Sequence, residues 1–115
     1  MVKRGQIWWA ELPEPSDSEP GYKRPVVIVQ ANEFNVSRLS TVIVATMTSN
    51  LRLADAPGNF KLKKVESGLP KDSVVNVSQL LTLGKSFLIE EVGQLRHTAI
   101  KQLDDGLLLV LGIII

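Results

Sequence analysis

Two short runs of β-branched, apolar residues constrain the fold of this chain more than any other feature. They occupy residues 25–30 and 41–47, and this composition is typical of buried strands. Pro25 is acceptable because we expect it to begin its strand, where a missing backbone N–H costs least. Since 115 residues can bury one modest hydrophobic core, we expect a single domain, residues 1–115, built around a sheet.

Weaker patterns predict the rest of that sheet. Four further strands are expected, at residues 6–11, 59–65, 73–83 and 87–95. The lysines of the second of these are typical of a strand at a sheet edge. Turn-forming and polar residues predict loops, turns or one short helical turn between the strands, at residues 12–23, 31–40, 48–58 and 68–72.

Only the C-terminal end has a strong helical pattern. Apolar residues recur there at helical spacing and predict one buried face, formed by Ile100, Leu103, Leu107 and Val110. Gly106 is expected to cost this helix about 1 kcal/mol relative to alanine. Further leucines widen the apolar surface and are interpreted as core residues, with a subunit interface as the alternative: Leu108, Leu109 and Leu111. The whole pattern predicts an α+β, mostly β fold, a small antiparallel barrel with a C-terminal helix.

Composition and charge exclude several classes of protein. The absence of cysteine excludes disulfide frameworks and thiolate metal sites and is consistent with a cytoplasmic location. No signal-peptide pattern is present, and the longest apolar runs, 107–111 and 113–115, are too short to span a bilayer, so no membrane partner is expected. A net charge of +1 argues against bulk coating of nucleic acid. Contact with nucleic acid would need a local group of basic residues. The middle of the chain offers one, which could also be an ordinary solvated surface: Arg52, Lys61, Lys63, Lys64 and Lys71.

The chain also lacks the residues of most hydrolytic mechanisms. Its one histidine, His97, is accompanied by no Gly-x-Ser-x-Gly motif, and no phosphate-binding glycine loop is present. Carboxylates never take metal-ligand spacing, so neither a catalytic metal nor another cofactor is expected. Catalysis would then depend on arginine, hydroxyl and amide groups, which suit a substrate that brings its own nucleophile. RNA does, because its 2′-OH can attack the adjacent phosphorus.

The segment around Arg24 carries a resemblance to a known family. It reads Ser18-Glu19-Pro20-Gly21-Tyr22-Lys23-Arg24-Pro25-Val26-Val27-Ile28-Val29-Gln30 and resembles the signature of the MazF/PemK family of toxin endoribonucleases. Further motifs follow the family's order across nearly the whole chain: Gly5-Gln6-Ile7-Trp8-Trp9, Thr48-Ser49-Asn50-Leu51, Pro57-Gly58-Asn59, Gly68-Leu69-Pro70-Lys71-Asp72-Ser73-Val74, Gln79, Thr82 and Val92-Gly93. Each motif is weak alone, but their joint order and spacing are specific.

The resemblance implies an SH3-like barrel, a homodimer and a cytoplasmic mRNA interferase of a toxin–antitoxin system. It further implies metal-independent cleavage of single-stranded RNA at a short preferred sequence, leaving a 2′,3′-cyclic phosphate and a 5′-OH. The implied partner is a cognate antitoxin whose acidic, flexible tail occupies the RNA groove. The alternatives are a non-catalytic toxin of the same fold that binds and poisons DNA gyrase, and a barrel that only binds RNA or protein, because one fold serves many functions.

Residue by residue, the resemblance makes Arg24 and Thr48 the catalytic pair. A guanidinium stays protonated and is a poor base, so we expect Arg24 to stabilise the phosphorane and to protonate the leaving oxygen. Thr48 follows the second apolar run, where its hydroxyl can bond a phosphate oxygen. Taken without the resemblance, the two residues would be interpreted as a surface ion-pair partner and a strand or cap residue. The expected RNA contacts are Ser18, Tyr22, Lys23, Ser49, Asn50 and Gln79.

Departures from the family pattern limit what is carried over. Many members read Gln-x-Arg-Thr-x-Asp, whereas this chain has Leu81 and Gly84 at the arginine and acid positions. Ser78 replaces the aspartate that one branch uses as a catalytic base, so that branch's three-residue mechanism is not transferred and the base stays unassigned.

Trp8 and Trp9 are adjacent in a strand and so point to opposite faces. One is expected in the core, and the other in the core, in a dimer interface or against an RNA base.

Overall fold

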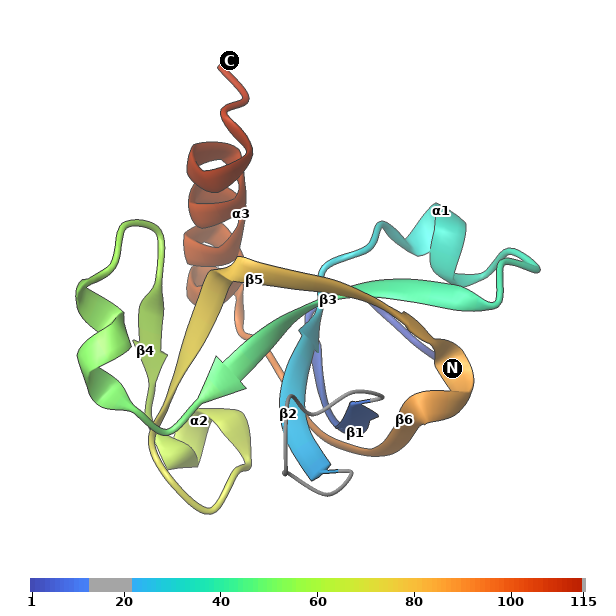
Figure 1. Cartoon of the computed structure of the whole chain (residues 1–115), viewed down its shortest axis with the longest axis horizontal. Helices are drawn as coiled ribbons and strands as arrows, with labels where there is room; N and C mark the ends of the chain where they lie inside the picture. Colours follow the sequence, from blue (N-terminus) through green and yellow to red (C-terminus); the bar gives the residue numbers. More distant parts are fainter. Residues whose placement is uncertain (13–21, 115) are drawn as a thin grey trace.

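A computed structural model describes residues 1–12 and 22–114. Within them, six strands form one antiparallel sheet in the order β4-β5-β3-β2-β1-β6. They are β1 (Gln6–Leu12), β2 (Tyr22–Ile28), β3 (Thr41–Thr48), β4 (Phe60–Leu62), β5 (Ser73–Gly84) and β6 (Leu88–Gln94). Figure 1 shows the sheet curled into a half-barrel, with the helix α3 (His97–Leu111) beside it. The predicted mostly β fold, an antiparallel barrel with a C-terminal helix, is confirmed.

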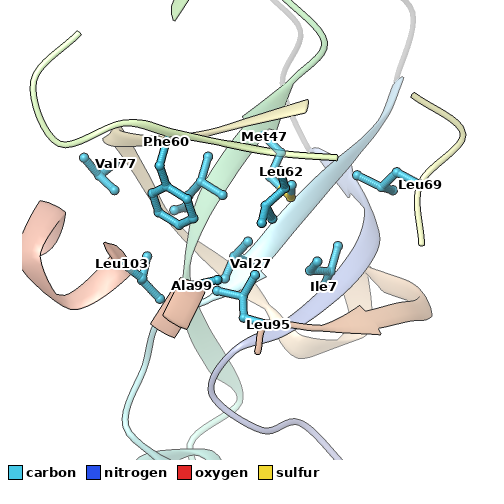
Figure 2. Packing of buried hydrophobic residues seen from close by; sticks show 12 residues of the cluster. Ile7, Val27, Met47, Phe60, Leu62, Leu69, Val77, Leu95, Ala99 and Leu103 are labelled. Atoms are coloured by element: carbon cyan, nitrogen blue, oxygen red, sulfur yellow. The ribbon is translucent and has the colours of Figure 1, made fainter. Parts of the chain in front are cut away.

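The sheet buries both of its faces, which explains why the two strongest strand patterns are apolar throughout. Alternate side chains of a strand point to opposite faces, and here they enter two separate clusters. One cluster packs against α3 and includes the side chains shown in Figure 2, among them Ile7, Val27, Met47, Phe60 and Leu103. The other lies on the opposite face and consists of Ala10, Leu12, Val26, Ile28, Val42, Val44 and Leu83.

β2 begins earlier than its sequence predicts. Tyr22 and Lys23 were expected in a loop, but their backbones pair with Leu12 and Glu11 of β1. Pro25 therefore lies inside the strand, opposite Trp9. It is tolerated because the pairing of β2 with β3 begins only at Val26, so no ladder bond to β3 requires an N–H at position 25.

Short helices connect several of the strands and are stabilised by local hydrogen bonds. The helical turn predicted within residues 31–40 is α1 (Asn32–Asn35), and the loop predicted at 48–58 contains the 3₁₀ helix η1 (Leu51–Asp55). A second 3₁₀ helix, η2 (Lys85–Phe87), precedes β6. The strand predicted at 59–65 is too long, because α2 (Lys64–Ser67) replaces its end and the Glu66 carboxylate accepts a bond from the Lys63 N–H at 2.9 Å. β4 does lie at the sheet edge.

β5 contains a bulge in its pairing with β3. Thr46 of β3 pairs with Asn76, whereas the preceding Ala45 pairs with Leu80, so residues 77–79 have no partner in β3. Figure 1 shows β5 bent along its length. The Asn59 side chain fixes this region, because its Oδ1 accepts from the Val77 N–H at 2.9 Å while its Nδ2 donates to the Leu53 carbonyl at 2.9 Å.

The predicted C-terminal helix is confirmed as α3, but only part of its predicted face is buried. Leu103 is fully buried, and Ile100 and Leu107 pack partly buried against the same cluster. Val110 was expected to be buried and is 39% exposed, because the last turns of α3 rise clear of the sheet (Figure 1). The core interpretation is also wrong for Leu109 and Leu111, which are 60% and 56% exposed. Among the described helices, none is long and apolar enough to cross a membrane.

Gly106 lies where α3 approaches the backbone that precedes β4. A Cβ at this position would overlap the Gly58 carbonyl oxygen and lie 3.1 Å from Cγ1 of Val77. Glycine is therefore required by packing, although it is a poor helix former.

Candidate functional site

Arg24 and Thr48 are brought together by the register of two neighbouring strands. Val26 of β2 pairs with Thr46 of β3. The strands are antiparallel and side chains alternate along each strand, so Arg24, two residues before Val26, and Thr48, two residues after Thr46, belong to the same face of the sheet. Both line one surface pocket of about 260 Å³. The structure thus unites the two residues that the sequence analysis treats as catalytic.

The walls of this pocket come from four parts of the described chain. Trp9 and Pro25 belong to β1 and β2, and Met47 and Ser49 come from β3 and the residue after it. The turn before β5 and the first residue of that strand supply the rest: Leu69, Pro70, Lys71 and Ser73. The sequence analysis did not select this turn as part of the site. Its signals were the Gly68–Ser73 stretch of the family motif and the inclusion of Lys71 in the basic group.

The pocket combines cations with hydroxyl groups. Arg24 and Lys71 are both exposed, and each carries a positive charge at neutral pH. The half-buried Thr48 accepts a hydrogen bond on Oγ1 from the Asn50 N–H at 3.1 Å. That bond occupies a lone pair of the oxygen, so the hydroxyl hydrogen can still be donated. Two cations and a donating hydroxyl favour a phosphate-sized anion as the ligand.

Ser49 and Asn50 differ in what they offer to a ligand. Ser49 is exposed and lines the pocket. The Asn50 side chain instead accepts from the Arg52 N–H at 3.2 Å and so caps η1. The residue predicted as an RNA contact is therefore engaged in shaping the loop that carries Ser49 and Leu51.

Trp8 and Trp9 point to opposite faces, as predicted. Trp9 packs against the cluster beneath α3 and lines the pocket, and the Nζ of Lys23 lies 5.7 Å from its ring centroid, within cation–π range. Trp8 packs against the other cluster and donates to Oε1 of Gln6 at 3.0 Å. A partly exposed aromatic ring beside the pocket offers a surface on which a base can stack.

The remaining predicted contacts lie at or beyond the margin of the pocket. Gln79 sits in the β5 bulge, where its Oε1 accepts from the hydroxyl of Thr46 at 3.0 Å. It thereby contacts the strand of Thr48 without lining the pocket. Tyr22 belongs to β2, but its side chain lies outside the described structure, and Ser18 lies outside the described residues altogether.

No group of three or more histidine, cysteine, aspartate or glutamate side chains that could hold a metal ion occurs among the described residues. His97 is exposed at the first position of α3. The groups gathered at the pocket are guanidinium, ammonium, hydroxyl and indole.

Comparisons with known proteins match nearly the whole chain. The model of the PemK-like, MazF-like toxins of type II toxin–antitoxin systems matches residues 3–111. The endoribonuclease MazF2 of Mycobacterium bovis and the endoribonuclease MazF6 of Mycobacterium tuberculosis are each 43% identical to this chain over 113 residues, covering 98% of it and 99% of their own length.

Solved structures share the fold at lower identity. An endoribonuclease from a mycobacterial species, solved in complex with its cognate antitoxin, superposes with a TM-score of 0.81 at 22% identity and covers 100% of this chain and 99% of its own. A MazE–MazF structure from Deinococcus radiodurans gives a TM-score of 0.79 at 17% identity and covers 98% of this chain and 97% of its own.

Proposed function

The chain belongs to the family of PemK-like, MazF-like toxins of type II toxin–antitoxin systems, and from this premise we propose that it is an endoribonuclease. Its active site is the pocket that Arg24 and Thr48 share. The observation that carries the proposal is the convergence of these two residues, from different strands, on one pocket that also holds Lys71. The relatives that are 43% identical over nearly their whole length are named endoribonucleases. We treat residues 1–115 as one toxin domain acting on mRNA in the cytoplasm.

The proposed reaction is transesterification of single-stranded RNA. The 2′-oxygen forms a bond to phosphorus as the bond from phosphorus to the 5′-oxygen breaks, which leaves a 2′,3′-cyclic phosphate and a 5′-OH. Arg24 binds the non-bridging oxygens, whose charge grows in the transition state, and its N–H groups favour protonation of the leaving oxygen. The Thr48 hydroxyl donates to a phosphate oxygen and fixes its orientation. The base that takes the 2′-OH proton is not assigned.

Cleavage is expected in excess EDTA, because the proposed catalytic groups are all side chains of the protein. Purified protein is incubated with a long single-stranded RNA of mixed sequence, and the product ends are identified by enzymatic labelling and mass spectrometry. A 2′,3′-cyclic phosphate with a 5′-OH supports the proposal. A requirement for added magnesium would refute the mechanism, and intact RNA together with inhibited DNA gyrase would favour the non-catalytic alternative.

We further propose a homodimer that is neutralised by a cognate antitoxin. The exposed apolar side chains near the end of α3 form a surface that monomers rarely leave in water: Leu109, Val110, Leu111, Ile113 and Ile114. One of the matched structures is an endoribonuclease in complex with its antitoxin. An acidic, flexible antitoxin tail would find complementary charge at Arg24 and Lys71.

Sedimentation measures the dimer directly. The wild type is expected to sediment as a dimer at micromolar concentration. The double variant Leu109→Asp, Leu111→Asp should shift toward the monomer, because it places two carboxylates in an apolar contact. Thr98→Asp, at an exposed position in the first turn of the same helix, serves as the control and should sediment as the wild type does. A wild-type monomer, or a double variant that remains dimeric, would contradict this assignment of the interface.

A further inference from the structure

A second hollow adjoins the Arg24 pocket. Its volume is about 400 Å³, and it shares three residues with the first pocket, namely Ser49, Pro70 and Lys71. The residues found only in the second hollow are Leu51, Lys64 and Asp72. The two hollows therefore lie side by side, with Lys71 between Arg24 and Lys64, and we refer to them together as the groove.

Local hydrogen bonds hold the far part of this groove in place. Oδ1 of Asp72 accepts from the Lys64 backbone N–H at 2.8 Å, which ties the start of α2 to the turn that carries Lys71. Lys64 and Lys71 therefore enter the groove from anchored backbone positions, while both side chains are exposed. Leu51, which also lines the second hollow, belongs to η1, whose first turn is fixed by the Asn50 cap.

The lining suits a nucleotide better than an apolar ligand or an isolated anion. Among the described residues that line the groove, three are cationic, Arg24, Lys71 and Lys64, and one is a carboxylate, Asp72. A row of cations matches a ligand whose negative charges repeat along a chain. Leu51, which is 41% exposed, and the exposed Pro70 offer apolar surface for the face of a base between these charges.

We propose that the second hollow binds the nucleotide next to the scissile phosphate, with Lys64 on its phosphate and Leu51 against its base. This inference rests on the proposed function and extends it, because it adds a binding subsite to the cleavage site. Lys64 and Leu51 act in binding and take no part in the bond-making step. The same groove gives the enzyme a directional path for single-stranded RNA.

The test uses an RNA oligonucleotide that spans a mapped cleavage site and carries 2′-deoxyribose at the scissile position, so that it binds without being cut. Lys64→Ala should weaken binding severalfold and reduce the slope of log Kd against log salt by about 0.7, the contribution of one phosphate contact on a single strand. Leu51→Ala should weaken binding with the slope unchanged. On cleavable RNA, both variants should raise KM and leave kcat near the wild-type value.

Lys3→Ala is the matched control, because Lys3 is an exposed lysine outside the basic group that lines neither hollow. It should retain the wild-type slope. If the wild type cleaves RNA but Lys64→Ala keeps the wild-type slope of log Kd against log salt, the proposed subsite is wrong while the proposed function stands. Loss of antitoxin neutralisation alone, with RNA binding unaffected, would assign the hollow to a polypeptide and likewise overturn it. A wild type that neither cleaves nor binds RNA would refute both proposals.

Discussion

Replacement of Arg24 by alanine is expected to lower the rate of RNA cleavage by about 10²- to 10³-fold, the usual cost of removing one donor to a developing oxyanion. The pocket offers no second guanidinium, since its other cationic side chain is the ammonium of Lys71. Arg24→Lys should recover part of the rate, because it restores the charge without the two parallel N–H bonds that a guanidinium gives to a phosphate. Single-turnover cleavage of a defined oligonucleotide measures both effects.

Two controls separate loss of catalysis from loss of structure. Arg24 is exposed, so the variant should keep the melting temperature of the wild type to within a few degrees. Arg38→Ala changes an exposed arginine outside the pocket and should cleave normally. Undiminished cleavage by a folded Arg24→Ala variant would show that Arg24 takes no part in the mechanism, although the protein would still be an endoribonuclease.

Gly106→Ala is expected to lower the free energy of unfolding by about 1–2 kcal/mol, although alanine is the better helix former. The added Cβ would overlap the Gly58 carbonyl oxygen, a backbone atom that cannot rotate away, and would crowd Val77. Overpacking costs about 1–3 kcal/mol, and a clash with a backbone atom belongs to the upper part of that range, so the cost exceeds the gain of about 1 kcal/mol in helix propensity. Urea titration followed by circular dichroism measures the change.

Gln102→Ala isolates the propensity term, because Gln102 is an exposed residue one turn earlier in α3. This variant should be as stable as the wild type or slightly more stable. If Gly106→Ala were also stabilised, the close approach of α3 to Gly58 would not exist in solution.

Gly106 also shows where the sequence pattern reaches its limit. Helical spacing predicts α3 correctly, because Leu103 and its neighbours at that spacing face a sheet. Spacing does not reveal which part of the helix meets another backbone, so the role of Gly106 and the exposure of Val110 became visible only in the structure. Both depend on contacts with residues far away in the chain.

The candidate site likewise contains residues that the sequence predicted and residues that only the structure revealed. Arg24 and Thr48 could be selected because the family resemblance assigns roles to the residue before one buried apolar run and to the residue after another. That they converge depends on the pairing of Val26 with Thr46, which no local pattern specifies. Pro70 and Ser73 were not selected, and Lys71 was named only in the basic group, because the turn from α2 into β5 reaches the pocket only through tertiary packing.

The pairing of β1 with β6 has a consequence for the synthesis of this protein. Gln6 pairs with Gln94 and Trp9 with Glu90, so this edge of β1 remains open until β6 has left the ribosome. Contacts so distant in sequence are slow to form, because a long loop must close first. Because Trp9 lines the pocket, a nascent chain that still lacks β6 carries one wall of the pocket on an unpaired strand edge, which is prone to pair with another chain.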